Sequence, residues 1–358
     1  MLLHMQSTPD LVAPNLTVHK IKHSTWIDYY YTFLGIAPDI SCTGPLETYL
    51  DEENHLIADV HQFADANAGA LTHNEIPATA LLLKDGSPGG VQVRRLSGVN
   101  ATPLMYGERT IGSYFEDADA RYCILGDIRP ENTDASRGEQ TMEVLDTIQD
   151  ALVDAGMEFH DVVRTWFYND RILDWYGEFN TARSTFFKRH GITAIPASTG
   201  IGVANRAGAA LVAKAIAVAP KNGSVTIRRV ESPLQCEASA YGSAFSRALE
   251  VADRASRVLY ISGTASIEPG GETAYVGDAM KQIEKTMEVV EAILENDRMS
   301  LTDTVRAIGY FRHREHIPLW DEYCRVHGVA PLPIVLAECE VCRKDLLFEI
   351  ELDAVRSA

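Results

Sequence analysis

The second half of this 358-residue chain repeats the order of its middle part. Residues 121–218 run from an apolar strand through a helical stretch, a second strand at 161–168, another helical stretch, Pro196 and a final apolar strand. Residues 259–355 pass through the same steps in the same order. A chain that contains one unit twice folds as two copies of one supersecondary unit, so the repeat limits the fold more than any other feature.

Several residues anchor the alignment of the two copies. The pairs are Gly126 with Gly263, Arg164 with Arg306 and Tyr168 with Tyr310. After Pro196 and Pro333 the copies run without a gap, which pairs Arg206 with Arg343 and Val212 with Glu349.

The sequence pattern of each copy predicts its helices and strands. Apolar residues recur at steps of three and four in the longer helical stretch of each copy, a second helix follows in each, and short apolar runs predict strands. The predicted helices are 139–155, 173–189, 271–296 and 317–327, and two of the predicted strands are 305–311 and 346–352. The order predicts an α/β (α+β) chain with two tandem domains, each a mixed sheet with two helices packed on one face.

The repeat also suggests where the domains divide. We expect an N-terminal domain over 1–224, with its repeat core at 121–218, and a C-terminal domain over 225–358, joined near 220–224. Residues 1–105 are less regular. Their apolar clusters at 81–84 and 91–93 flank a glycine-rich turn and predict a hairpin that extends the first domain's sheet.

The charge balance restricts the partners. A formal net charge of -18 leaves no basic excess to offset phosphate repulsion, so nucleic acids and anionic membranes are not expected partners. No apolar run approaches the roughly 18–20 residues of a membrane span, and the start lacks the pattern of a secretory signal. Six irregularly spaced cysteines are typical of reduced thiols, so we expect a cytoplasmic protein.

Two segments resemble the Rid (YjgF-type) family. They are Ile261-Ser-Gly-Thr-Ala-Ser266 and Leu347-Phe-Glu-Ile-Glu-Leu-Asp-Ala354, and Phe245-Ser-Arg-Ala-Leu249 is similar to an element near the start of that family. The resemblance implies small chorismate-mutase-like domains that trimerise and form active sites between neighbouring subunits. Active Rid deaminases carry an arginine two residues after the proline that opens the last segment, and this chain departs from that pattern with Ser198 and Val335.

The tandem arrangement and the segment Cys342-Arg-Lys-Asp-Leu-Leu-Phe-Glu-Ile-Glu351 resemble the chorismatases. This resemblance implies an enzyme of secondary metabolism that converts chorismate to 3-hydroxybenzoate, with or without 4-hydroxybenzoate, and pyruvate, using neither metal nor cofactor. Two alternatives stay open. One is hydrolysis of chorismate to a dihydroxycyclohexadiene carboxylate and pyruvate. The other is a non-catalytic Rid-like protein that binds small carboxylates.

Glu349 is the predicted catalytic acid. Cleavage of the enolpyruvyl ether of chorismate begins by protonation of its methylene carbon, which needs a carboxylic acid kept neutral by burial. In Rid proteins an acidic residue of the last strand lies close to the reacting atoms, and only the second copy keeps a carboxyl there, since the first has Val212. Glu351 and its partner Lys214 are polar in both copies, which predicts an outward position. The alternative is that Glu349 also belongs to a solvated strand face.

Cys342 lies seven residues before Glu349. In the chorismatases a cysteine at this place is associated with 3-hydroxybenzoate formation, so the resemblance makes Cys342 a second catalytic residue that steers the product. The alternative is a small buried core residue. Cys339 and Cys342 also form a lone Cys-x-x-Cys pair, which is weak support for a metal site, and no nucleotide-binding loop is present.

Bidentate arginines suit the two carboxylates of chorismate. If the site forms between the copies, as it does between Rid subunits, groups of the first copy face Glu349. The predicted substrate-binding residues are Arg164, Tyr168, Arg171, Tyr241, Gly263 and Arg343. The alternative for each arginine is a surface ion pair. The chain is expected to act as a monomer or a small homo-oligomer.

Overall fold

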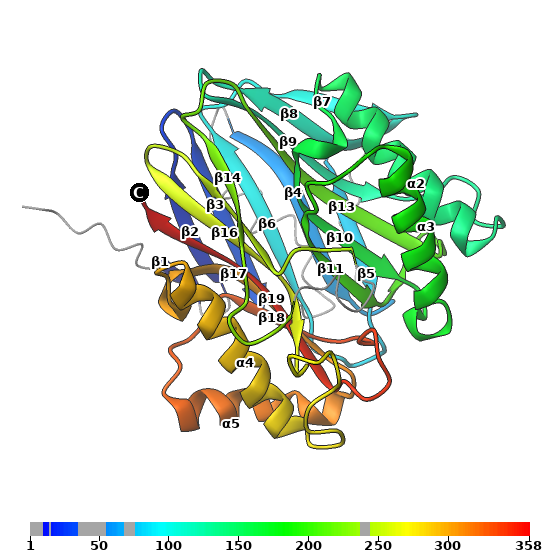
Figure 1. The fold of residues 1–358 in the computed structure, drawn as a ribbon, viewed down its shortest axis with the longest axis vertical. Coiled ribbons are helices and arrows are strands. Elements are labelled where there is room, and N and C mark those ends of the chain that lie inside the picture. Colours follow the sequence, from blue (N-terminus) through cyan, green and yellow to red (C-terminus); the bar gives the residue numbers. More distant parts are fainter. Residues whose placement is uncertain (1–9, 14–15, 35–54, 68–75, 237–243) are drawn as a thin grey trace, which may run out of the picture.

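The computed structural model of the chain describes residues 10–13, 16–34, 55–67, 76–236 and 244–358. Their strands form three mixed sheets, which we name the N-terminal, middle and C-terminal sheets (Figure 1). Together with the helices they make an α+β fold.

The N-terminal sheet has the strand order β1-β2-β3-β6-β4-β5-β12. Its strands are β1 (Asp10–Ala13), β2 (Leu16–Lys22), β3 (Ile27–Leu34), β4 (His55–Ala64), β5 (Ala78–Leu82), β6 (Gly90–Ser97) and the two-residue β12 (Ala204–Asn205).

The middle sheet has the order β11-β10-β13-β9-β8-β7, and the C-terminal sheet has the order β14-β15-β16-β19-β17-β18. The strands of the middle sheet are β7 (Thr102–Tyr106), β8 (Arg109–Glu116), β9 (Ala120–Ile128), β10 (Val162–Asn169), β11 (Ala197–Gly202) and β13 (Leu211–Pro220). Those of the C-terminal sheet are β14 (Thr226–Val230), β15 (Ala248–Ala252), β16 (Ser256–Ala265), β17 (Thr304–Phe311), β18 (Ile334–Glu338) and β19 (Phe348–Ser357).

All three sheets follow one plan. Each has one parallel pair at its edge, namely β4–β5, β10–β11 and β17–β18. The first strand of each pair also lies antiparallel to a long central strand, which is β6, β13 or β19. A register shift interrupts these antiparallel pairs at matching points, immediately before Asp59, Arg164 and Arg306. The N-terminal sheet is therefore a third copy of the unit, which the sequence repeat did not reveal.

Helices cover the outer faces of two sheets. The middle sheet carries α2 (Arg137–Asp154) and α3 (Tyr176–Arg189), and the C-terminal sheet carries α4 (Ala279–Asn296) and α5 (Pro318–His327) (Figure 1). A capping box of Ser136 and Glu139 begins α2, because the serine side chain accepts from a free backbone N–H and the glutamate reaches back. Short 3-10 turns lie at η1 (Phe159–Asp161), η2 (Ile172–Asp174), η4 (Leu301–Asp303) and η5 (Arg314–His316).

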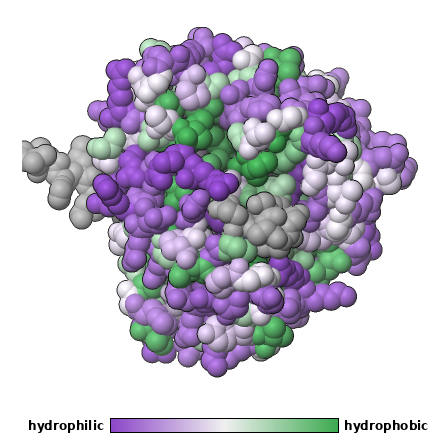
Figure 2. All heavy atoms as spheres, viewed as in Figure 1, coloured by the Kyte–Doolittle hydropathy of each residue, from purple (hydrophilic) through white to green (hydrophobic). Residues whose placement is uncertain are grey.

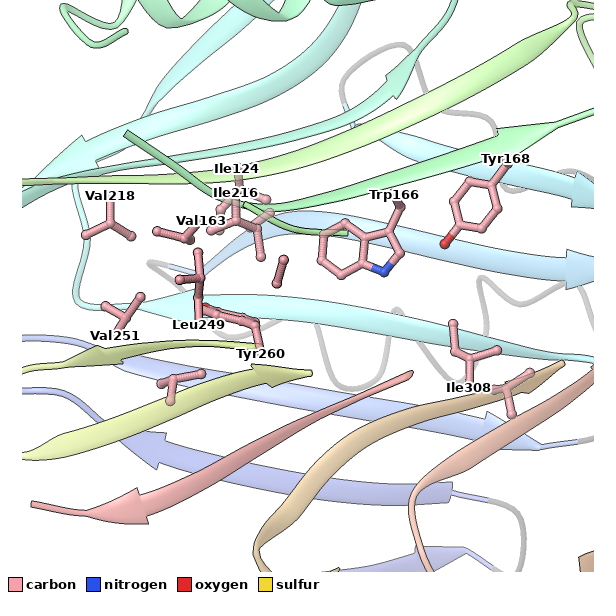
Figure 3. Close-up of a cluster of buried hydrophobic side chains, with 14 of the residues drawn as sticks. Ile124, Val163, Trp166, Tyr168, Ile216, Val218, Leu249, Val251, Tyr260 and Ile308 are labelled. Carbon is pink, nitrogen blue, oxygen red and sulfur yellow. The ribbon is translucent and has the colours of Figure 1, made fainter. Parts of the chain in front are cut away.

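The inner faces of the three sheets enclose one apolar core. Figure 3 shows side chains of this core, among them Trp166, Tyr168 and Ile308, directed into the space between the sheets. Phe63, Tyr168 and Tyr310 occupy equivalent positions on β4, β10 and β17, and the ring of Phe63 lies 6.1 Å from Tyr168 and 6.2 Å from Tyr310. These buried rings mark the centre of an approximate threefold arrangement.

The sheets close into a ring through their parallel edges. Strand β11 lies against β16, β18 lies against β3, and β5 lies against β9. The edge of each sheet thus meets the central strands of the next, and three similar seams result.

The face of the molecule drawn in Figure 2 is largely hydrophilic. Figure 2 shows polar side chains over most of one face, with a group of hydrophobic side chains exposed in its upper half. None of the described helices has the length and apolar character needed to cross a membrane.

The structure confirms some expectations and overturns others. The two helices on one face of each repeated sheet are confirmed, although α4 begins at Ala279 rather than near 271. The hairpin predicted around 85–90 is wrong, since β5 and β6 lie on opposite sides of β4. Residues 10–97 also do not extend the first domain's sheet, because they build a sheet of their own that pairs only with the short β12.

One anchor of the repeat is shifted by one residue. Leu125 pairs with Ala215, and Ile261 pairs with Leu352, so a bulge that follows in both strands makes Asp127 the structural equivalent of Gly263. The other pairings near the site agree with the prediction, because Val212 lies opposite Tyr168 as Glu349 lies opposite Tyr310.

Candidate active site

Glu349 lies in the second position of β19, opposite Ala265 of β16 and Tyr310 of β17. Side chains alternate along a strand, and the apolar ones of β19, Phe348, Ile350 and Leu352, pack toward the helices. The acidic side chains of β19 therefore share the face that is turned toward the other sheets. Glu349 is only 5% exposed.

The carboxyl group of Glu349 packs directly over the backbone of Gly263. A Cβ atom at position 263 would collide with Oε1 of Glu349 and would lie 3.1 Å from its Cδ and 3.2 Å from Cγ2 of Thr199. The Gly263 N–H donates to Oγ1 of Thr199 over 3.0 Å. Gly263 was predicted to line the site because backbone must approach closely there, and the group that it admits is the Glu349 carboxyl itself.

Glu349 is a carboxylic acid at neutral pH. Burial, reinforced by the charge of Glu351, raises its pKa to about 8, although Arg164 and Arg247 act in the opposite direction. A carboxyl with this pKa keeps its proton at pH 7 and can act as a general acid.

Glu351 lies at the centre of a hydrogen-bonded ion cluster and not on the surface, so the expectation of an outward position is wrong. Its carboxylate accepts from Arg164 Nη2 at 2.6 Å, from Arg306 Nη2 at 2.7 Å and from Trp166 Nε1 at 2.8 Å. The Thr199 hydroxyl donates a further, short hydrogen bond to it. The physical reason is that both faces of β19 are covered, one by helices and the other by the middle sheet.

The arginines of the ion cluster determine the protonation state of Glu351. Burial alone would raise its pKa, but Arg306 and Arg164 outweigh burial and hold the pKa below its usual value. Two acidic residues on one face of one strand therefore carry different charges at neutral pH.

Cys342 lies in the turn before β19 and packs against Ala265, Ile267 and Leu346. Burial, followed by the charge of Glu349, raises the pKa of its thiol to about 12. The side chains of Cys342 and Glu349 therefore lie within electrostatic reach of each other, and the sulfur is held as a thiol.

The predicted arginines lie in different surroundings. Arg164 is fully buried on β10, and its Nη2 donates to both Glu351 and Thr199. Arg343 follows Cys342, and its Nη1 donates to the Gly271 carbonyl at 2.6 Å.

Two predicted side chains are less closely tied to Glu349. The side chain of Arg171 is 65% exposed and contacts Asp170 at 3.2 Å. Tyr168 is fully buried in the central core, where burial raises its pKa well above the usual value. Tyr241 lies outside the described residues.

Arg247 is a candidate residue that the sequence analysis missed. It precedes β15, is 2% exposed, and donates from Nε and Nη2 to the Cys236 carbonyl at 3.0 and 2.7 Å. Its charge also lowers the pKa of Glu349, which places its guanidinium close to the acid. The signal was available, since Arg247 is the middle residue of the segment 245–249 that resembles the Rid family.

The second seam, between the N-terminal and middle sheets, has no acid at the equivalent position. Val212 takes the place of Glu349, and Lys214, in the place of Glu351, binds Asp59 at 2.6 Å. Asp59 occupies the position that Arg164 has in the seam between the middle and C-terminal sheets, so both seams contain an ion pair, with the charges reversed.

The third seam, between the C-terminal and N-terminal sheets, is filled. Gly90 takes the place of Glu349, and a Cβ there would lie 2.6 Å from the Phe33 carbonyl oxygen and 2.7 Å from Cγ2 of Val335. Of the three equivalent positions, only the seam between the middle and C-terminal sheets has a carboxyl beside a glycine and a threonine.

Comparisons with known proteins agree with this architecture. The family model described as Endoribonuclease L-PSP matches residues 128–219. A 3-hydroxybenzoate synthase of Streptomyces hygroscopicus is 28% identical over 277 residues, which are 69% of this chain and 77% of that protein.

A solved structure is similar over nearly the whole molecule. The crystal structure of a chorismatase at 1.08 Å resolution superposes with a TM-score of 0.69 at 19% identity, and covers 93% of this chain and 100% of the other. At this identity the likeness establishes the fold, including the part that the family model does not match.

Proposed function

This chain belongs to the chorismatase family of proteins with Rid-like domains, and on that premise we propose that it converts chorismate to 3-hydroxybenzoate and pyruvate. The observation that carries the proposal is Glu349, a buried carboxyl that keeps its proton at neutral pH. Chorismate offers the matching chemistry, because its enolpyruvyl ether is cleaved by acid.

Glu349 donates its proton to the methylene carbon of the enolpyruvyl group. The ether carbon then becomes an oxocarbenium ion, which Glu349 as a carboxylate and the nearby ionised Glu351 help to stabilise. Water traps this ion, and breakage of the ether bond then releases pyruvate and leaves the dihydroxycyclohexadiene carboxylate. Loss of one ring hydroxyl and one ring proton as water aromatises the ring to 3-hydroxybenzoate and returns the water that was consumed. The products 3-hydroxybenzoate and pyruvate together contain all the atoms of chorismate, so no oxidant or reductant is consumed.

Arg247 and Arg343 are the proposed partners of the substrate carboxylates. The charge of Arg247 acts on the Glu349 carboxyl and the charge of Arg343 acts on the Cys342 thiol, so both guanidiniums lie near the predicted catalytic residues, and a guanidinium is the group suited to bind a carboxylate. Arg164 supports the site differently, because its charge is compensated by Glu351.

The first test is pyruvate release from chorismate, measured with a coupled dehydrogenase. We expect turnover by the wild type and a loss of about 10²-fold or more in Glu349→Gln, which keeps the shape but has no proton to give. Glu338→Gln, which removes a carboxyl on β18 that pairs with Lys84, is the matched control and should stay active. A wild-type protein that shifts its melting temperature with chorismate but releases no pyruvate would instead be a binding protein.

The pH dependence provides a second test. Glu349 acts in its protonated form, and burial raises its pKa to about 8. Activity should therefore be retained below pH 8 and fall as the pH rises through 8. A profile that rises over the same range would contradict general acid catalysis by this residue.

The presence of Cys342 is the reason for proposing 3-hydroxybenzoate as the product. We expect Cys342→Ala to release pyruvate still but to form the dihydroxycyclohexadiene carboxylate in place of much of the 3-hydroxybenzoate. Chromatography of the reaction mixture separates the two. Cys324→Ala, which changes a thiol on the outer helix α5, is the control. The dihydrodiol as the main wild-type product would support the hydrolase alternative.

A further inference from the structure

Four side chains donate hydrogen bonds to the buried carboxylate of Glu351. Arg164 from β10, Arg306 from β17, Trp166 and Thr199 all donate to its two oxygens. A buried carboxylate with this number of charge-assisted donors stays ionised.

Thr199 links the cluster to the backbone over which Glu349 packs. The Oγ1 atom of Thr199 accepts from Arg164 at 2.7 Å and from the Gly263 N–H at 3.0 Å, and it donates to Glu351. Gly263 is the residue over which the Glu349 carboxyl packs. The positions of the two carboxyls are therefore set by one shared framework of the first and second copies.

We propose that Glu351 is a positioning residue for the reaction proposed above: a permanently ionised neighbour, held by Arg164 and Arg306, that keeps Glu349 in its proton-carrying form. The side chains of Glu349 and Glu351 lie two residues apart on the same face of β19. A negative charge at 351 therefore disfavours ionisation of the carboxyl at 349. The inference rests on the proposed function for its catalytic meaning, but the charge relation between the two carboxyls can be measured without substrate.

The other charged groups near Glu349 act in known directions. Arg164 on β10 and Arg247 before β15 favour its ionised form. Cys342, in the turn before β19, is a neutral thiol. Glu351, by contrast, is a described neighbour whose charge adds to the effect of burial and favours the proton on Glu349.

The test compares Glu351→Gln with wild type in two measurements. The first is the pH–rate profile with chorismate. The second is an infrared titration of the protein alone, in which the carboxylic acid band absent from Glu349→Gln reports the proton of Glu349. Loss of the charge at 351 also removes the carboxylate that pairs with Arg164, so we expect both midpoints to move to lower pH by about one unit or more.

Asp353→Asn is the matched control. Asp353 lies on the same face of β19, is 1% exposed and contacts the same Arg306 at 3.5 Å, but it is two residues further from Glu349. The amide there should move the midpoint less than Glu351→Gln does. If Glu351→Gln fails to fold, the paired variant Arg306→Gln/Glu351→Gln removes one charge of each sign and should show the same direction of shift.

An unchanged infrared midpoint in a folded Glu351→Gln or paired variant would overturn the proposal, and so would an equal shift in Asp353→Asn. A shifted infrared midpoint in a protein that does not turn over chorismate would refute the proposed function and leave the charge relation intact.

Discussion

Glu349 and Glu351 stand two positions apart on one strand, and the pKa values of their carboxyl groups are displaced in opposite directions. Both are buried, so exposure does not separate them. The difference comes from their partners, since Glu351 has two arginines in direct contact and Glu349 packs over a glycine. One strand thus supplies a proton carrier and a fixed anion from the same residue type.

Gly263→Ala tests the close packing at the acid. The added methyl group would occupy the place of the Glu349 carboxyl oxygen, so the carboxyl must turn away. We expect a loss of about 10²-fold or more in turnover, because displacement by a bond length disrupts proton transfer, with the protein still folded by circular dichroism.

Gly177→Ala on the exposed start of α3 is the control for this substitution, because a Cβ there meets no atom within 4 Å. Full activity in Gly263→Ala would show that the orientation of the carboxyl is not important for the reaction.

The sequence was sufficient to single out Glu349 but not its surroundings. The pairing of Glu349 with Val212 marked the one copy that keeps an acid, and that register is correct. The alternating pattern of β19 predicts an outward acidic face at Glu351, and this prediction is wrong. Alternation distinguishes two faces of a strand, yet it does not show whether the polar face meets water or another sheet.

The three sheets resemble one another more in the pairing of their strands than in amino-acid sequence. The parallel pair and the register shift recur in each sheet. The N-terminal copy was not recognised because its chemistry differs at the matching points, with Asp59 in place of the arginine and Gly90 in place of the acid. The predicted hairpin failed for a related reason, since β4, which separates β5 from β6, comes from earlier in the chain.

The seam between the C-terminal and N-terminal sheets should be sensitive to added volume. Gly90→Val would press against the backbone of Phe33, on the paired strand β3 of the same sheet, and against the side chain of Val335 on β18 across the seam. We expect the free energy of unfolding to fall by about 1–3 kcal/mol, measured by chemical denaturation.

Gly200→Ala on β11 is the control for this seam, since a Cβ there has no neighbour within 4 Å and should change stability by no more than about 0.5 kcal/mol. Equal stability of both variants would show that the seam is loosely packed.

The whole molecule brings three copies of one unit into a closed ring. The core between the sheets takes side chains from all three, and the candidate active site takes Thr199 from the middle sheet and Glu349 from the C-terminal sheet. The Rid resemblance predicted sites between neighbouring units, and here the neighbours are parts of one chain.

Activity should therefore not require a second chain. We expect the specific activity toward chorismate to stay constant on dilution over about three orders of magnitude, because every described group of the site belongs to one polypeptide. Loss of specific activity on dilution, with recovery on concentration, would show that a partner chain completes the site.

Because the three copies belong to one chain, residues at one seam can be substituted without changing the other two seams. In a ring of identical subunits, a substitution appears at every interface at once, and a change that strengthens one seam alters all catalytic centres with it. In this chain the Lys214–Asp59 pair and the Gly90–Val335 contact could arise while the carboxyl at 349 stayed in place. Two of the three seams can thus stabilise the fold. The third can retain a buried acid, although burial of that acid lowers the stability of the folded protein.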